Sequence, residues 1–464
     1  MSTHLRLTQL HLGLGSFHRA HQAVYLQALH AQGDKSWRIV GGNLRPDMLD
    51  TIAALQAQNG TYTLETVNTA GERFYQTISA IENVISWDAE LSGLTQVAAD
   101  PNTRIISFTV TEAGYYLDAH HQLDEHFADL RADLAGAHST IYGALTKLLT
   151  ARMQANAGAV TLLNCDNLRS NGERFYGGLK QFLVKRGDTA LLAWVEANTT
   201  APNAMVDRIT PRPTADIRER VKAATGRDDA AALMAETFIQ WVIEDHFAHG
   251  RPAWEQVGVE MVQDVMPYEE AKIRLLNAPH SCIAWAGTLR GYGYIHQGTQ
   301  DPDIRQMAYD YVTQDVIPCL DHPDHPSPIN LAHYRDVVLD RFSNPNILDT
   351  NQRVAMDGFS KIPGFIQPTL REALAAGRSI EAVAMLPALF LVFLQRQQRG
   401  EVPFNYEDQA MNPATAQAIC QADDPVAAFA AERVLFGPLA GDERLIAALR
   451  HAVARVHQFM GATA

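Results

Sequence analysis

The segment AKIRLLNAPHS, residues 271–281, carries three side chains with complementary chemistry. Lys272, Asn277 and His280 lie within nine residues of one another, and apolar residues stand between them. Burial lowers the pKa of a lysine, and a neutral amine is a suitable base for an alcohol proton. Amide and imidazole groups can then hold the developing alkoxide. The alternative interpretation is structural: a surface lysine followed by a helix that carries a capped histidine.

The spacing sets a condition on the helix that carries these residues. Asn277 and His280 are three positions apart and therefore share a helix face. Lys272 precedes Asn277 by five positions, about one and a half turns. We expect Lys272 to reach a common pocket only if the helix is irregular between them.

The segment HLGLGSFHRAH, residues 11–21, resembles a dinucleotide-binding turn that lacks its third glycine. Gly13 suits the tight turn and Gly15 suits close approach of a pyrophosphate to the backbone. Phe17 and His18 occupy the region where the last glycine of G-x-G-x-x-G is expected. The pattern therefore indicates either a phosphate cradle of unusual type or a plain strand-to-helix turn.

The end of the second expected strand leaves the choice between NAD and NADP open. It has the sequence Gly41-Gly42-Asn43-Leu44-Arg45, without the carboxylate that usually binds the adenosine ribose. Asp47 follows soon after. Arg45 either contacts a 2′-phosphate or is a solvated loop cation.

Polar residues follow two further expected strands. Asn164, Asp166 and Asn167 end one of them, and Thr111 and Glu112 follow the other. Ligands of open α/β sheets bind beyond the carboxyl ends of the strands, so these side chains are candidates for a site. Their alternative role is turn and cap chemistry.

Two cations in the segment DTNQRVAMDGFSKIPGF, residues 349–365, are further candidates. Arg353 and Lys361 are either binders of polyol hydroxyls or structural ions.

The elements that must position these residues change along the chain. Strand-like and helical segments alternate in the first half, which predicts a parallel, doubly wound sheet. Helical patterns dominate after about residue 270. We therefore expect a Rossmann-type dinucleotide-binding domain at 1–268 and a mainly α-helical substrate and catalytic domain at 269–464. The strands are expected at 5–12, 36–44, 104–116 and 159–167, and the first helices at 19–30 and 47–58.

Composition excludes several classes of protein. The formal net charge is −14, which disfavours nucleic-acid binding. The four cysteines form no C-x-x-C pair, which indicates a reducing, cytoplasmic setting without a disulfide framework. The most apolar run, residues 383–394, is too short to span a bilayer, so no membrane association is expected. His322, Asp324 and His325 lie in a proline-rich loop without a companion ligand, and we expect no metal site.

The motifs in their chain order are similar to those of the polyol-specific long-chain dehydrogenase, or mannitol dehydrogenase, family. They are GLGSFHRAH, TVTEAGYY, NCDNLRSNGERF, MVDRITP, KIRLLNAPHS and DTNQRVAMDGFSKIP. The resemblance covers essentially the whole chain, and K-x-x-x-x-N-x-x-H is its most specific motif. The family pattern G-x-G-x-F-x-R-x-H contains Phe17, Arg19 and His21, which accounts for the missing third glycine.

The resemblance implies a zinc-independent, NAD-dependent oxidation of a small polyol by a monomeric enzyme. It implies that Lys272 is the general base, that Asn167 and Asn277 form the oxyanion hole, and that His280 binds and orients the reacting oxygen. Arg353 and Lys361 would hold distal hydroxyls, and Glu112 would relay the proton to water. The implied cofactor contacts are Gly13, Gly15, Ser16, Phe17, Arg19, Asn43, Thr111 and Asp207.

Two alternatives stay open at this stage. One is a different substrate within the same family, either a hexitol or a hexuronate, and a hexuronate would need an extra cation in the pocket. The other is a regulator that binds NAD without catalysis, since Rossmann-type domains are reused in that way. The set of Lys272, Asn277 and His280 argues against a regulator, because a sensor has no need of a base.

Overall fold

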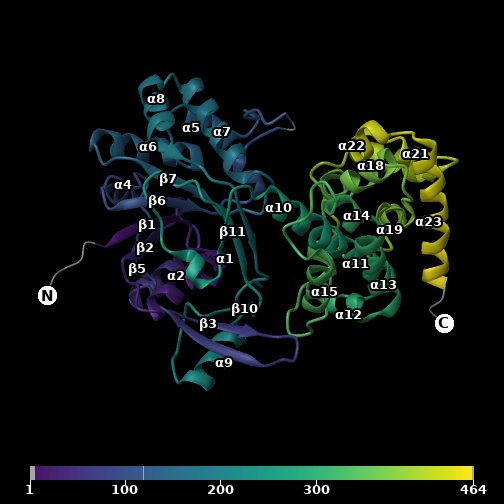
Figure 1. Ribbon diagram of the computed structural model, residues 1–464, viewed down its shortest axis with the longest axis horizontal. Coiled ribbons are helices and arrows are strands. Elements are labelled where there is room, and N and C mark those ends of the chain that lie inside the picture. Colours follow the sequence, from purple (N-terminus) through teal and green to yellow (C-terminus); the bar gives the residue numbers. More distant parts are fainter. Residues whose placement is uncertain (1–5, 119, 462–464) are drawn as a thin grey trace. The chain divides into compact units, whose positions relative to one another are not determined.

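The computed structural model describes residues 6–118 and 120–461, without the side chains of Glu112 and Ala113. The chain forms two compact units. One comprises Met1–Val67 and Arg73–Met266, and the other comprises Asn68–Glu72 and Pro267–Ala464 (Figure 1).

A six-stranded parallel sheet is the centre of the N-terminal unit. Its order is β5-β2-β1-β6-β7-β8, so the chain builds outward from β1 to one side and then returns to build outward from β6. This topology confirms the predicted doubly wound fold, and its switch point lies between β1 and β6. The strands are β1 (Leu7–Leu12), β2 (Trp37–Gly42), β5 (Ile81–Ile85), β6 (Thr103–Phe108), β7 (Val160–Asn164) and β8 (Thr199–Thr200).

Helices cover both faces of this sheet, which is why its central strands β1, β6 and β7 are buried almost throughout, polar residues included. On β1, Leu10 and Leu12 pack with Ile106 and Phe108 against helices α4, α6, α7 and α8. Leu14, Ile39 and Ile105 belong to the core on the other face, beneath α1, α2 and α3 (Figure 1). The helices of this unit are α1 (Ser16–Ala20), α2 (Gln22–Ala31), α3 (Leu49–Ala57), α4 (Ser92–Ala98), η1 (Glu112–Tyr115), α5 (Ala128–Leu134), α6 (Ile141–Gln154), α7 (Asn171–Arg186), α8 (Thr189–Asn198), α9 (Ala215–Thr225) and η2 (Trp254–Val257).

Two local expectations need correction. The strand predicted at 104–116 ends at Phe108, and the chain then turns into the short helix η1. The helix predicted at 19–30 is two helices that meet at His21, whose backbone is not helical. In both cases apolar side chains continue through a bend, because they pack against the core on either side of it.

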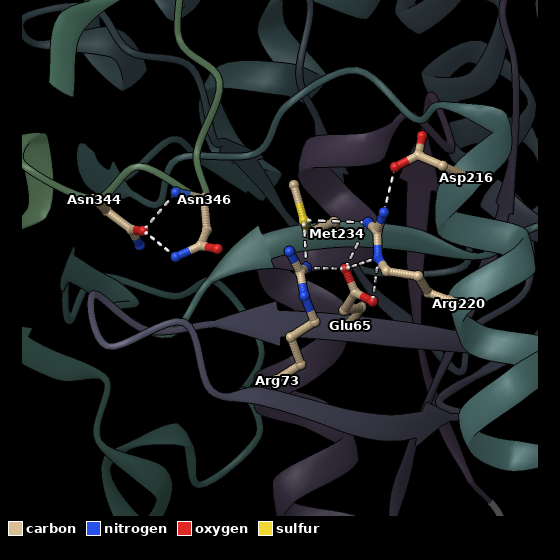
Figure 2. A network of polar contacts seen from close by, with 7 residues as sticks. All are labelled: Glu65, Arg73, Asp216, Arg220, Met234, Asn344 and Asn346. Carbon is tan, nitrogen blue, oxygen red and sulfur yellow. Dashed lines mark hydrogen bonds and ion pairs between the residues drawn. The ribbon is translucent and has the colours of Figure 1, made fainter. Parts of the chain in front are cut away.

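Two small sheets extend the N-terminal unit. Their orders are β10-β3-β4 and β12-β11-β9. In the first, the buried carboxylate of Glu65 on β3 accepts hydrogen bonds from Arg73 at 2.6 Å and from Arg220 of α9 at 2.8 Å, and Arg220 also pairs with Asp216 (Figure 2). The strands are β3 (Tyr62–Val67), β4 (Arg73–Ile78), β10 (Leu233–Glu236), β9 (Ala204–Asp207), β11 (Gln240–Glu244) and β12 (Glu260–Val262).

The C-terminal unit is mainly helical, as predicted. Its centre is α19 (Glu381–Gln398), whose residues from Ala382 to Leu394 are all buried. The other helices are α10 (Met266–Lys272), which begins at the junction, α11 (Ala278–Leu289), α12 (Ile295–Gln300), α13 (Pro302–Asp310), α14 (Ile317–Leu320), α15 (Leu331–Phe342), α16 (Asn351–Ala355), α17 (Gly358–Lys361), α18 (Gln367–Ala375), α20 (Pro413–Gln421), α21 (Pro425–Ala430), α22 (Arg433–Phe436), η6 (Gly437–Leu439) and α23 (Glu443–Gly461). Three π-helical turns, η3 (Ile273–Asn277), η4 (Tyr311–Val316) and η5 (Ile362–Ile366), interrupt this series.

Across residues 6–118 and 120–461, no helix has the length and apolar character needed to cross a membrane.

Candidate active site

The glycine turn lies at the carboxyl end of β1, beside the switch point of the sheet. Gly13 has φ of 101°, a conformation that L side chains rarely adopt, and its N–H donates to the Gly42 carbonyl at 2.9 Å. A Cβ at Gly15 would meet nothing within 4 Å, so the backbone there is open to a ligand. Backbone N–H groups at such a turn are suited to a dinucleotide pyrophosphate, and the residues present fit that group.

Two of the predicted cofactor contacts are buried supports of this turn. Arg19, only 2% exposed, donates to the Leu14 carbonyl at 3.2 Å and to the Ala231 carbonyl at 2.6 Å. Asn43 accepts from the Leu14 N–H at 3.0 Å and donates to the Asp47 carbonyl at 3.1 Å. These polar groups hold the turn, and their expected contact with a cofactor stays a prediction.

The aromatic residue of the motif also packs within the protein. The Phe17 ring stacks on His21 with centroids 4.9 Å apart, and His21 Nε2 lies 2.8 Å from the Gln240 carbonyl. Ser16 begins α1 next to the glycine turn.

Asp166 holds the loop that follows β6. Its Oδ1 accepts hydrogen bonds from the backbone N–H groups of Val110 and Thr111, each at 2.8 Å, and its Oδ2 accepts from the Tyr115 hydroxyl at 3.2 Å. Thr111 has φ of 68°, which is strained for a β-branched residue and which these bonds maintain. Burial raises the pKa of Asp166 to about 6, against the opposing effect of the donated hydrogen bonds.

The loop after β2 carries an exposed carboxylate, Asp47, and a cation, Arg45, that is hydrogen-bonded within the protein. Arg45 donates to the Ser139 carbonyl at 3.0 Å, to the Tyr116 hydroxyl at 2.9 Å and to Asp129 at 3.1 Å. Asp47 is exposed, and its carboxylate accepts a bond from Asn43 at 3.1 Å.

In the C-terminal unit, a π-helical turn separates Lys272 from Asn277. Helix α10 ends at Lys272, η3 occupies Ile273–Asn277, and α11 begins at Ala278. The Ala278 N–H donates to the Ile273 carbonyl, which is an i→i+5 bond. A wider turn brings residues five apart toward the same side of the helix. The irregularity on which the sequence-based hypothesis depended is therefore present, and Lys272, Asn277 and His280 share one side.

Prolines account for the position of this turn. Proline has no N–H, and its ring clashes with the carbonyl four residues earlier, so a widened turn relieves it. Each π turn in this unit ends two residues before a proline: η3 before Pro279, η4 before Pro318 and η5 before Pro368. Helix α19 accommodates Pro387 without a π turn, so proline favours the widening but does not suffice for it.

Ion pairs of the buried Arg274 with two partly exposed carboxylates brace the same turn. Arg274, inside η3, makes two hydrogen bonds to Glu372 of α18 at 2.6 and 2.8 Å, and a third to Glu270 at 2.8 Å. Bidentate arginine–carboxylate pairs fix geometry as well as adding attraction. This brace lies on α18, which directly follows η5, so two of the π turns are tied together.

Lys272 is 6% exposed, as the hypothesis of a buried base requires. Glu269, three residues earlier and 5% exposed, lies one helical turn away. The sequence analysis missed Glu269, although the spacing in EEAK indicates a carboxylate and an amine on one helix face.

His280 is held from two sides. Its ring stacks on Phe342 with centroids 4.4 Å apart, and its Nε2 lies 3.0 Å from Oδ2 of Asp349. Burial lowers the pKa of His280, Asp349 opposes that effect, and the nearby cations Arg353 and Lys361 add to it. The structure thus brings both predicted substrate-binding cations close to His280.

Arg353 and Lys361 each have a contact within the protein. Arg353 Nε and Nη2 donate to Asp349 at 2.8 and 2.7 Å, and Lys361 Nζ donates to the Val354 carbonyl at 2.6 Å. The Arg353 side chain is 66% exposed, which leaves it accessible to a ligand.

The remaining candidates belong to the N-terminal unit. Asn167 is exposed in the loop after β7, and Asp207 is buried at the end of β9. The side chain of Glu112 lies outside the described residues. Among the residues that the structure describes, no group of three or more His, Cys, Asp or Glu side chains is arranged to hold a metal ion.

Comparison with known proteins gives a consistent result. The model described as the mannitol dehydrogenase Rossmann domain matches residues 8–256, and that described as the mannitol dehydrogenase C-terminal domain matches residues 264–457. The chain is 59% identical to a D-arabinitol 4-dehydrogenase of Ralstonia nicotianae, over 98% of this chain and 97% of that protein. It is 54% identical to a D-arabinitol 4-dehydrogenase of Klebsiella pneumoniae, over 97% and 98%. A structure of Pseudomonas fluorescens mannitol 2-dehydrogenase with NAD and D-mannitol matches with a TM-score of 0.83 and 33% identity, over 98% of this chain and 94% of that one.

Proposed function

The chain belongs to the mannitol dehydrogenase family, and we propose that it is an NAD-dependent polyol dehydrogenase that oxidises D-arabinitol to D-xylulose reversibly, without a metal ion. The observation that carries the proposal is the buried Lys272 on the same helix side as Asn277 and His280, in a chain 59% identical to a D-arabinitol 4-dehydrogenase. The similarity over nearly the full length supports the choice of substrate.

Lys272 is the proposed general base. It takes the proton of the reacting hydroxyl, and its burial favours the neutral amine that this step needs. Bound NAD supplies the hydride acceptor. Glu269, one turn before Lys272, is placed to receive the proton next, and Glu112 relays it to water.

Amides stabilise the oxygen as it loses its proton. Asn277 and Asn167 donate hydrogen bonds to the developing alkoxide, which is the oxyanion role. His280 orients the reacting carbon–oxygen bond, and Arg353 and Lys361 hold distal hydroxyls. Hydroxyl groups suit these donors without requiring a charge on the substrate.

The cofactor is proposed to bind at the glycine turn. Gly13, Gly15 and Ser16 would hold the pyrophosphate, and Phe17, Thr111 and Asp207 would supply further contacts to the cofactor. Arg19 and Asn43 act by holding the turn. The exposed Asp47 and the engaged Arg45 favour a ribose hydroxyl over a 2′-phosphate, because a carboxylate repels a phosphate.

An assay of the purified protein tests this proposal. Reduction of NAD and of NADP is followed with D-arabinitol, L-arabinitol, xylitol and D-mannitol, and the oxidation of NADH with fructuronate. NAD reduction with D-arabinitol well above the other polyols, with D-xylulose as the product, supports the proposal. A preference for D-mannitol or fructuronate would show that D-arabinitol is not the main substrate. Tight NAD binding without turnover would favour a regulator.

The setting of the enzyme is part of the same proposal. We expect a cytoplasmic monomer that does not bind nucleic acid, which the net charge of −14 and the four free cysteines support. Light scattering on the purified protein measures the oligomeric state, and full activity after treatment with a chelator is the expected result for a metal-independent reaction.

A further inference from the structure

Asp349 lies between two residues of the candidate site, although the sequence motif did not single it out. Its Oδ2 is 3.0 Å from Nε2 of His280, and Arg353 donates to both of its oxygens at 2.8 and 2.7 Å. The side chain of Asp349 is 8% exposed and that of His280 is 14% exposed. The carboxylate is thus enclosed between an imidazole and a guanidinium.

From this arrangement we propose that Asp349 is a positioning residue: its carboxylate faces Nε2 of His280 in a close contact that lacks hydrogen-bond alignment in this structure, keeps the ring proton on Nε2, and leaves Nδ1 as the nitrogen that accepts a hydrogen bond from a substrate hydroxyl. The inference rests on the polyol dehydrogenase function proposed above and refines how that site recognises its substrate.

The chemistry of the two groups determines the tautomer. An ionised carboxylate only accepts hydrogen bonds, so the ring nitrogen that faces it carries the proton. Because burial lowers the pKa of His280, the ring is neutral at pH 7, and its other nitrogen is an acceptor. The histidine therefore meets a substrate hydroxyl as an acceptor and not as a donor.

The stacked ring of Phe342 restricts the remaining freedom of His280. The two rings are nearly parallel, at 14°, with centroids 4.4 Å apart. A half-turn of the imidazole about its bond to Cβ would keep this stacking but would move Nε2 away from Asp349, so the two contacts together fix the orientation of the ring. The hydrogen-bond-accepting lone pair of Nδ1 therefore points in one fixed direction.

The number of protons on the reacting hydroxyl identifies which substrate hydroxyl donates to His280. The reacting hydroxyl has a single proton, which Lys272 takes. Nδ1 consequently accepts from the neighbouring hydroxyl of the polyol, and by holding that hydroxyl His280 orients the reacting carbon–oxygen bond. The site thus selects substrates with a hydroxyl next to the carbon that is oxidised.

Arg353 keeps Asp349 ionised and in place. Burial by itself would raise the pKa of this carboxyl, but His280 and Arg353 hold it well below its usual range. Arg353 therefore acts on His280 through Asp349, in addition to its proposed contact with substrate.

The first experiment combines kinetics with histidine NMR on the full chain. The ring nitrogens are followed in protein labelled at histidine, and the His280 signal is identified as the one lost in His280→Gln. We expect the Nε2–H tautomer in the parent protein and a mixed or Nδ1–H ring in Asp349→Asn, because an amide can donate as well as accept. We expect the kcat for D-arabinitol to fall about 10- to 100-fold in that variant.

Asp301→Asn is the matched control. The side chain of Asp301 is 9% exposed, close to the value for Asp349. Its Oδ2 lies 3.8 Å from Nε of Arg290 and accepts a hydrogen bond from the Tyr292 hydroxyl at 3.0 Å. None of the contacts that the structure describes joins Asp301 to His280. We expect it to lower the melting temperature while the His280 signal and kcat stay as in the parent protein.

A double-variant cycle tests the part assigned to Arg353. In the Asp349→Ala background, Arg353→Met should cause a smaller loss of kcat than in the parent protein, because the route through Asp349 is already gone. Fully additive losses would overturn that part of the proposal.

The ring NMR separates this inference from the proposed function. A parent protein that oxidises no polyol would refute the proposed function. The tautomer of His280 would still show whether Asp349 keeps the ring proton on Nε2. An Nδ1–H ring in the parent protein, or an unchanged ring in Asp349→Asn, would overturn the inference even if the enzyme oxidises D-arabinitol.

Discussion

The two units prepare their candidate binding residues in opposite ways. In the N-terminal unit, buried side chains hold the backbone: Arg19 and Asn43 fix the glycine turn, and Asp166 fixes the loop at Thr111. In the C-terminal unit, the backbone of a π turn places the side chains of Lys272 and Asn277.

This difference follows from the ligands that each unit is proposed to bind. A pyrophosphate is bound by backbone N–H groups, so the side chains nearby are free to act as supports. Proton transfer needs a particular side chain at a particular point. The turns of the helix that carries it must therefore direct that side chain to the same side as the other site residues. A replacement should therefore act through cofactor binding in the first unit and through kcat in the second.

Replacement of the base should have the largest effect. In Lys272→Ala, we expect kcat for D-arabinitol to fall about 100- to 10,000-fold, because no group of similar chemistry takes the proton. NAD affinity, measured by calorimetry, should be unchanged, and small amines should restore part of the rate. Lys185→Ala, which removes an exposed ion pair with Glu125, is the control. Full activity of Lys272→Ala would contradict the proposed role of Lys272 as the general base.

The π turn should be the next most sensitive element. In Pro279→Ala, the helix can return toward i→i+4 bonding and rotate Lys272 away from Asn277, so we expect kcat to fall about 10-fold or more. Pro318→Ala changes the matched proline after η4, outside the catalytic motif, and should leave kcat unchanged. Equal kinetic effects of the two replacements would contradict the special role of η3.

The glycine turn offers the corresponding test in the N-terminal unit. Gly13 and Gly136 have similar φ values, 101° and 112°, and a Cβ at either would meet little or nothing nearby. Replacement by alanine should therefore cost a similar amount of stability at both, about 1 kcal/mol. Only Gly13→Ala should also weaken NAD binding, by about 10-fold. Binding weakened equally by both variants would refute this assignment.

The last prediction concerns the pH dependence of stability, and we expect it to have the smallest effect on activity. Burial raises the folded-state pKa of Asp166 to about 6 from 3.8, so between these values the folded state binds more protons than the unfolded state. The free energy of unfolding should therefore fall as the pH rises through this window, by up to about 3 kcal/mol from this group. Asp166→Asn should flatten that slope in urea titrations, and a slope equal to that of the parent protein would contradict the shift.

Local patterns predicted the elements that depend on neighbours in the chain. The apolar runs at β1, β2, β6 and β7 indicated buried parallel strands, and the glycines after β1 indicated the turn. They could not show where β6 ends, because Val110 stays apolar beyond the last paired residue. The two small sheets also escaped prediction: β3 and β4 form a local hairpin that was missed, whereas β10 and β11 pair with strands far away in the sequence.

Roles that depend on distant partners were less predictable. The cofactor contact expected of Arg19 stays a prediction, and nothing in the sequence indicated its hydrogen bond to the carbonyl of Ala231, 212 residues away. Arg353 was expected to bind substrate, and its contact with Asp349 became visible only in the fold.

The sequence by itself determined which chemical groups are available and how they are spaced: a lysine, an asparagine and a histidine in one helical segment, and glycines after the first strand. Proline at 279 favours a widened turn at that point, because the clash of its ring is local. Only the tertiary structure decided that the widening occurs, that Lys272 is buried, and that Asp349 faces His280. Those outcomes depend on packing and on charge pairs between distant segments, such as Arg274 with Glu372, which spacing along the chain cannot express.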